Sequence, residues 1–289
     1  MTHTQFIKDY KKIIDRTIFS PDFLSLGQFT SENRQSEDGT TRTTIISYAS
    51  ACCSMSTPIG LTYVSLASII FSMLDLLLEK KGVVHGGNFK DRCLSLNVSQ
   101  VSSDTEKIQE YVYRILKQIR NCVIHNISSI SLNKNSIQLH YTLSSSSFDL
   151  VISPSNLEKV LQIAYYLSCG LSPCLQSLPD MYISGALASI YDKLISETVI
   201  TDNIQHVPYR LNTPIKLAVP HREQHLETRY EVVEDQLICI ENINHNYIRK
   251  YNIDYIFSYN GKQYVVPQEL LDQEKRIPIR KLEPWAMKN

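Results

Sequence analysis

Three side chains that can act on a phosphate group lie within six residues of one another: Arg120, Asn121 and His125. An arginine can bind a phosphate through two parallel hydrogen bonds and stabilise the negative charge that grows on it. A histidine titrates near neutral pH and can therefore accept or donate a proton. RNA carries its own nucleophile, the 2′-hydroxyl, beside the scissile phosphate. These residue types are therefore sufficient for RNA cleavage without a metal ion.

A helix over residues 103–126 is expected to position these side chains. It begins with a capping box, Ser103 followed by Glu106. Its apolar residues recur at helical spacing, namely Ile108, Val112, Ile115, Ile119 and Cys122. At 100° per residue, Arg120 and His125 project about 140° apart, so one helix does not direct both at a single small target. Two copies packed face to face would do so, and the sequence therefore predicts a homodimer.

Two further basic residues are predicted to contact RNA. Arg114 and Lys117 lie on the same helical flank as Asn121 and His125 and form a basic track that leads to them. Asp75 belongs to the preceding long helix, and it could reach the motif if the two helices pack antiparallel. We therefore treat Asp75 as an accessory site residue.

The segment Arg120–His125, with the sequence RNCVIH, resembles the R-x4-H signature of the HEPN superfamily (higher eukaryotes and prokaryotes nucleotide-binding). The match includes the polar residue after the arginine and the position at the end of a long helix, and it covers about residues 58–199. The resemblance implies a helical domain that dimerises across this helix. It also implies an endoribonuclease in which Arg120 and His125 are catalytic and Asn121 is an accessory ligand. Its products would end in a 2′,3′-cyclic phosphate and a 5′-hydroxyl.

The resemblance also suggests a biological setting and partners. HEPN ribonucleases act as toxins or phage-defence effectors, so an antitoxin or regulatory protein is an implied partner beside RNA. Some HEPN toxins carry a tyrosine two residues after the histidine, which the antitoxin modifies. This chain has Ile127 there, so we do not expect regulation by that route.

A second interpretation assigns the motif no catalytic role. Arginine and histidine are favoured in the last turn of any helix, where they interact with free carbonyl groups and with the helix dipole. In that case the domain would be a catalytically silent HEPN-like module that binds a nucleotide or a partner.

Composition limits the classes of function. The chain has 289 residues, 43% of them hydrophobic, so it can bury a sizeable core. Its 29 basic residues balance 29 acidic ones, and any contact with nucleic acid must therefore be local. The seven cysteines form no CxxC pair, which is typical of reduced thiols in a cytoplasmic protein. The N-terminal residues lack the apolar region of a signal peptide.

The most apolar segment is Pro58–Lys80, which is long enough to cross a membrane. However, Ser65, Ser68, Ser72 and Asp75 form a continuous polar line at helical spacing. Such a line favours a buried helix with one polar edge, so we expect a core helix and no membrane association.

The remaining patterns predict an α+β chain that is mainly α: a HEPN-like helical bundle core with a small C-terminal β-rich appendage. Alternating residues around 133–135 indicate a hairpin, and helices are expected over 155–168 and 179–199. Six of the eleven prolines lie between Pro208 and Pro284, and Asn260-Gly261 is typical of a hairpin turn. We therefore predict an N-terminal helix and mobile polar loop (1–57), a helical domain (58–200) and a β-rich domain (201–289).

One pair of histidines raises the question of a metal site. His221 and His225 are four residues apart, but they follow Pro220 and match no established zinc motif. We therefore expect neither a metal site nor a cofactor.

Overall fold

The computed structural model describes residues 5, 8–9, 28–32, 43–47, 61–96, 103–143, 145–170, 176–202, 209–218, 222–240 and 252–288. The chain forms two compact units whose segments alternate along the sequence. The first unit comprises Met1–Phe23, Ser50–Gly170 and Ile190–Asn212, and the second comprises Leu24–Ala49, Leu171–Ser189 and Thr213–Asn289. Each unit is described below by itself.

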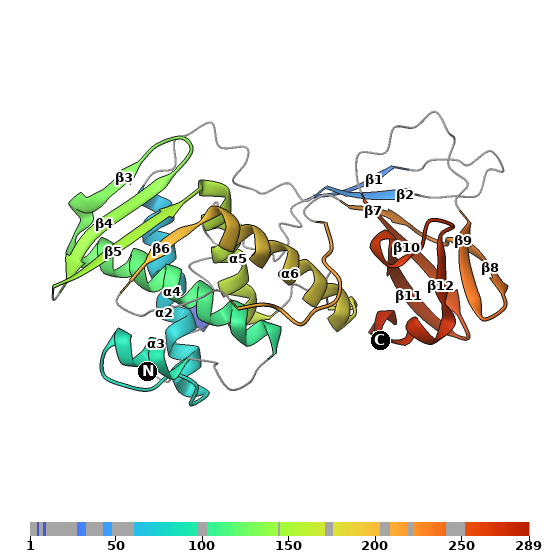
Figure 1. The fold of residues 1–289 in the computed structure, drawn as a ribbon, viewed down its shortest axis with the longest axis horizontal. Helices are drawn as coiled ribbons and strands as arrows, with labels where there is room; N and C mark the ends of the chain where they lie inside the picture. Colours follow the sequence, from blue (N-terminus) through green and yellow to red (C-terminus); the bar gives the residue numbers. More distant parts are fainter. Residues whose placement is uncertain are drawn as a thin grey trace. The chain divides into compact units, whose positions relative to one another are not determined.

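The first unit combines helices with a four-stranded sheet (Figure 1). Its helices are α2 (Leu61–Lys80), α3 (Phe89–Ser95), α4 (Asp104–His125), η2 (Ile127–Ser129), α5 (Pro154–Cys169) and the C-terminal part of α6 (Asp180–Glu197). Its strands are β3 (Ile130–Leu132), β4 (Ile137–Leu143), β5 (Ser146–Ile152) and β6 (Val199–Thr201). They pair in the order β3-β4-β5-β6, and every pair is antiparallel.

Helix α4 is the centre of the first unit. Its predicted capping box is confirmed, because the Ser103 side chain accepts from the Glu106 backbone while the Glu106 side chain accepts from the Ser103 backbone. Every residue from 110 to 119 is buried, and the Tyr113 ring lies 5.0 Å from that of Phe71 on α2. The middle of α4 is therefore covered by other parts of the same chain, and the exposed residues of the helix, Glu106, Ile124 and His125, lie near its two ends.

The sheet of the first unit has a clear buried face. Along β4, Ile137, Leu139 and Tyr141 are buried, whereas the residues between them are exposed. Leu150 of β5 pairs with Leu139 and is also buried, and both strands contact α4. Buried and exposed residues thus alternate along the strand, so that one face of the sheet packs against the helices, as an alternating sequence predicts.

The predicted fold class is wrong in its proportions. The chain is α+β, but it is not a helical bundle with a small β appendage, because its strands build three separate sheets. The hairpin expected around residues 133–135 is present, yet it belongs to a four-stranded sheet, and three of its strands, β3, β4 and β5, lie between α4 and α5 in the sequence. The sequence analysis undercounted strands because β6 has only three residues and gives no alternating pattern of its own.

The second unit contains two sheets. One sheet has the order β1-β2-β7-β10-β11 and the other has the order β12-β9-β8. Their strands are β1 (Gln28–Glu32), β2 (Thr43–Ser47), β7 (Arg222–His225), β8 (Arg229–Val233), β9 (Gln236–Ile240), β10 (Asn252–Tyr259), β11 (Lys262–Pro267) and β12 (Arg276–Pro278). The β7–β10 pair is parallel, and the other pairs are antiparallel. Short 3-10 helices follow at Gln268–Leu270, Ile279–Lys281 and Glu283–Trp285.

The predicted hairpin turn at Asn260-Gly261 is confirmed between β10 and β11. Both residues have positive φ, 47° and 76°, as a two-residue type I′ turn requires. The strands that it joins bury Tyr255, Phe257 and Val266 in the core of the second unit.

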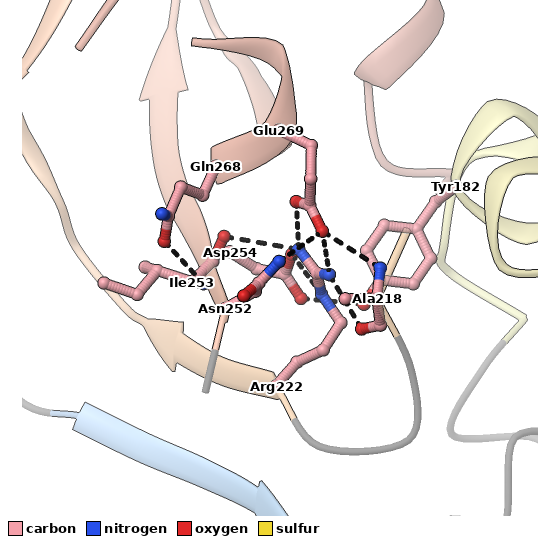
Figure 2. Close-up of polar contacts among 8 residues, drawn as sticks. All are labelled: Tyr182, Ala218, Arg222, Asn252, Ile253, Asp254, Gln268 and Glu269. Atoms are coloured by element: carbon pink, nitrogen blue, oxygen red, sulfur yellow. Dashed lines mark hydrogen bonds and ion pairs between the residues drawn. The ribbon is translucent and has the colours of Figure 1, made fainter. Parts of the chain in front are cut away.

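A fully buried arginine organises the polar interior of the second unit (Figure 2). Arg222 of β7 donates from Nε and NH2 to one oxygen of Asp254, at 2.8 and 2.6 Å. It also donates to both oxygens of Glu269, at 2.7 and 2.8 Å. Tyr182 of α6 donates to the other oxygen of Asp254 at 2.7 Å. One guanidinium group therefore joins two strands, a 3-10 helix and the start of α6.

The electrostatic consequences of this burial differ between the two acids. Burial raises the pKa of Asp254 above its ordinary value although Arg222 opposes the shift. Burial also acts to raise the pKa of Glu269, but its hydrogen bonds with Arg222 and Asn252 outweigh this and lower that pKa to about 2. Glu269 therefore stays ionised at neutral pH and compensates the positive charge of Arg222.

Several sequence expectations meet the structure only in part. The helix expected over 155–168 is present as α5, but its N-cap is Ser153 rather than Ser155, because Pro154 occupies the first helical turn. The helix expected over 179–199 is α6. Of the expected N-terminal helix, only residues 5, 8 and 9 are described, and these are helical. Most of the polar loop lies outside the described residues, although β1 and β2 occur within 1–57. No helix in the described part of the chain has the length and apolar character to cross a membrane.

Candidate active site

A cavity of about 710 Å³ lies beside the C-terminal end of α4 in the first unit. Four of its lining residues come from this helix, namely Lys117, Arg120, Asn121 and His125. Asp75 of α2 lines it as well. The cavity therefore brings together five of the six site residues that were proposed from the sequence.

The motif residues differ in how firmly they are held. Arg120 donates from NH1 to Oδ1 of Asn121 at 3.2 Å, and Asn121 is buried. His125 is the last residue of α4 and is exposed. The helix ends directly after it, where the backbone N–H of Asn126 donates to the carbonyl of Cys122 at 2.8 Å. The arginine is thus held beside its neighbour, while the histidine faces solvent at the edge of the cavity.

The angular separation of Arg120 and His125 does not keep them apart in space. The sequence analysis expected that a second copy would be needed to direct both side chains at one target. In the structure both line the same cavity of one chain. A helical wheel gives only the direction in which each side chain leaves the helix, and it omits the neighbouring elements that enclose the helix end. Homodimerisation stays a prediction, but the separation of these residues does not require it.

Arg114 occupies a different position from the expected basic track. Its side chain is 3% exposed and donates from Nε and NH2 to the carboxylate of Asp202, at 3.2 and 3.0 Å. Glu110 lies 3.8 Å from its Nε, and burial raises the pKa of Glu110 to about 7. Arg114 is therefore part of a buried ion-pair cluster and does not line the cavity.

Lys117 links this cluster to the cavity. Its Nζ lies 3.6 Å from Oδ2 of Asp202, and its side chain is only 3% exposed. It nevertheless lines the cavity. Asp202 thus holds a nearly buried ammonium group at the side of the cavity where Arg120 and Asn121 lie.

Asp75 is also engaged by neighbours. Its Oδ1 accepts a short hydrogen bond from the hydroxyl of Tyr113, and its Oδ2 accepts from NH1 of Arg92 at 2.6 Å. Both carboxylate oxygens therefore have a donor within the chain. This arrangement suits a residue that positions its neighbours better than one that accepts a proton from substrate.

Another side of the cavity is formed by α3, from which the sequence patterns suggested no site residue. Asn88, Lys90 and Arg92 line the cavity from this segment. Asn88 caps the helix, because its side-chain oxygen accepts from the backbone N–H of Asp91 at 3.0 Å. The spacing of an asparagine three residues before an aspartate is a helix-start signal that could have revealed α3.

Gly86 determines how the chain enters α3. Its φ is +108°, and a Cβ at this position would lie 2.5 Å from Cβ of Asp91. Only glycine fits here without a shift of the backbone. The close approach places the cap residue and the first turn of α3 beside the cavity.

The third side of the cavity is less polar. Leu143 at the end of β4, with Ser146 and Phe148 at the start of β5, lines it from the hairpin. The ring of Phe148 stacks on that of Tyr141, with centroids 4.9 Å apart and planes at 7°. A ligand in the cavity would therefore meet basic groups from α3 and α4 and an apolar surface from the hairpin.

Comparison with known proteins gives no independent guide to the role of this cavity. No family model, curated protein or solved structure matches the chain. Within the described residues, no three or more histidine, cysteine, aspartate or glutamate side chains are grouped in a way that could hold a metal ion. The chemistry of the cavity must therefore be inferred from the side chains that line it.

Proposed function

We propose that the first unit is a metal-independent endoribonuclease whose active site is the cavity at the end of α4. The observation that carries this proposal is the common location of Arg120, Asn121 and His125, which were selected from the sequence by the chemistry of their side chains. All three line one cavity, and Lys117 adds a second cation beside Arg120. The resemblance to HEPN ribonucleases supports the same residues and the same reaction.

The proposed reaction is an attack of the 2′-hydroxyl on the adjacent phosphorus. The 2′-oxygen forms a bond to phosphorus while the bond from phosphorus to the 5′-oxygen breaks. The 2′-hydroxyl loses a proton, and the departing 5′-oxygen gains one. His125 performs one of these transfers, and Arg120 and Lys117 stabilise the extra negative charge on the phosphate oxygens. The products are a 2′,3′-cyclic phosphate end and a 5′-hydroxyl end.

A homodimer would supply groups for both proton transfers of this reaction. One His125 per chain supplies one proton-transfer group, whereas the reaction has two transfers. Ile124 and His125 in the last turn of α4 are exposed, and a second copy that approached there would add a second histidine. In a single chain, a water molecule would perform the proton transfer that His125 does not perform. The proposed setting, a toxin or phage-defence effector restrained by an antitoxin or regulatory protein, comes from the family resemblance.

RNA cleavage by the purified chain is expected to persist in excess EDTA, because proton transfer and a phosphate clamp suffice for the proposed reaction. The measurement is cleavage of a structured RNA mixture on a denaturing gel, with and without the chelator. Complete loss of cleavage in EDTA, with recovery when a divalent ion is added back, would contradict the proposal. Binding of RNA without any cleavage would instead favour the catalytically silent module.

A further inference from the structure

The cavity has cations on two sides, and the proposed reaction uses only the cations on the α4 side. Arg120, Lys117 and His125 come from α4, whereas Lys90 and Arg92 come from the segment around α3. A single scissile phosphate would be bound by the α4 residues. The α3 cations therefore require a separate explanation.

Arg92 has a structural role that accounts for its position. Its guanidinium donates from Nε to the carbonyl of Gly86 at 3.2 Å, from NH1 to Asp75 at 2.6 Å and from NH2 to Glu79 at 2.9 Å. Burial lowers the pKa of Arg92, but the hydrogen bonds with the two carboxylates outweigh it and raise that pKa above its ordinary value. Arg92 thus fixes α3 to α2, and its charge is compensated by these acids.

Lys90 differs from Arg92 in both exposure and partners. It lies in the first turn of α3, lines the cavity and is exposed. Among the described residues, no carboxylate forms an ion pair with it. The turn that carries it is held by the Asn88 cap and by Arg92, so its backbone position is fixed by its neighbours. Lys90 is therefore the cation on the α3 side whose charge remains available to a ligand.

The size of the cavity fits a ligand that touches both sides. A volume of about 710 Å³ lies within the range of about 300–1,000 Å³ that small-molecule sites occupy, which is enough for one nucleotide with its flanking phosphates. A nucleotide whose scissile phosphate lies at Arg120 carries its neighbouring phosphate at the other end of the sugar. A cation at a second side of the cavity suits that phosphate.

We propose that Lys90 binds the phosphate next to the scissile one, so that the site recognises two consecutive phosphates of an RNA strand. This inference rests on the proposed endoribonuclease function. Lys90 would act on substrate binding rather than on the chemical step. Its loss should therefore raise KM and leave kcat nearly unchanged.

The test combines a variant that lacks the Lys90 charge with RNA substrates in which one phosphate is uncharged. The substrate is an RNA oligonucleotide that carries a mapped cleavage site, and two derivatives replace the phosphate on the 5′ or the 3′ side of the scissile one by an uncharged methylphosphonate. For the wild type, one of the two derivatives should have a KM about tenfold higher than the native RNA, as expected for the loss of one charge-assisted contact. Lys90→Gln should raise the KM for native RNA by a similar factor and should show little further loss with that derivative.

Lys134→Gln is the matched control, because Lys134 is an exposed lysine of the same unit that does not line the cavity. It should respond to both derivatives as the wild type does. Additive losses in Lys90→Gln, or a wild type that is insensitive to both derivatives, would overturn the inference while leaving the nuclease intact. Absence of any cleavage by the wild type would instead overturn the proposed function and this inference with it.

Discussion

Replacement of His125 by alanine is expected to lower the rate of RNA cleavage by about 10²–10⁴-fold, the usual contribution of a general acid or base. The folded structure should be retained, because His125 is exposed and lies at the very end of α4. Loss of its interaction with the helix dipole should cost no more than about 1 kcal/mol. The measurement is single-turnover cleavage of a labelled RNA, with circular dichroism to verify the fold.

His140→Ala is the matched control for this experiment. His140 is another exposed histidine of the first unit, where it pairs with Asp149 on the neighbouring strand and does not line the cavity. Its variant should cleave RNA at the wild-type rate. If His125→Ala and His140→Ala cleave equally fast, His125 is a helix-end residue with no catalytic role.

Replacement of Arg222 by alanine is expected to destabilise the second unit by about 3–5 kcal/mol, because it leaves a buried carboxylate without its cation. Asp254 is fully buried, and Arg222 supplies two of its hydrogen bonds. Glu269 would lose both contacts with the same guanidinium. The large expected effect arises from these unpaired charges rather than from the intrinsic strength of the ion pair.

The single tryptophan provides a direct measurement of this effect. Trp285 is buried and belongs to the second unit, so its fluorescence during urea unfolding reports on that unit. With a denaturant slope of about 1–3 kcal/mol per molar urea, the midpoint should fall by at least ~1 M. Arg276→Ala, which removes an exposed partner of Asp272, should leave the midpoint unchanged. Equal midpoints for wild type and Arg222→Ala would contradict the structural role assigned to Arg222.

Local signals predicted the elements that carry the motif. The capping box of Ser103 and Glu106 placed the start of α4 correctly, because a cap depends on residues only three positions apart. The Asn260-Gly261 turn was predictable for the same reason. Both features are encoded within a few neighbouring residues and need no information from distant parts of the chain.

The wrong proportion of helix and strand has a physical cause. Strand β1 has the sequence QFTSE and β6 has the sequence VIT, and neither presents a run of alternating apolar residues. Such strands are specified by the neighbours with which they pair, such as β5 for β6 and β2 for β1. An interpretation based on periodicity therefore predicts a polar loop at residues 28–32, which form strand β1.

The sequence indicated which residues to examine for a site but not what surrounds them. Arg120, Asn121 and His125 were selected by their types and spacing, and all three line one cavity. Arg114 was assigned to an RNA-contacting track because its partner, Asp202, is 88 residues away and gives no local signal. Lys90 was missed because α3 is short and its position depends on Gly86 and on the contacts of Arg92 with α2. Burial and ion pairing are tertiary properties, and the sequence pattern alone did not reveal them.

In the proposed reaction, the cavity at the end of α4 uses the 2′-hydroxyl of the RNA itself as the nucleophile. The most direct test compares an RNA oligonucleotide that contains a mapped cleavage site with the same oligonucleotide carrying a single 2′-deoxyribose at that site. The first should be cleaved in EDTA to a 2′,3′-cyclic phosphate end and a 5′-hydroxyl end, and the second should remain intact at that position. Cleavage of the deoxy-substituted site, or products that carry a 5′-phosphate, would contradict the proposed mechanism.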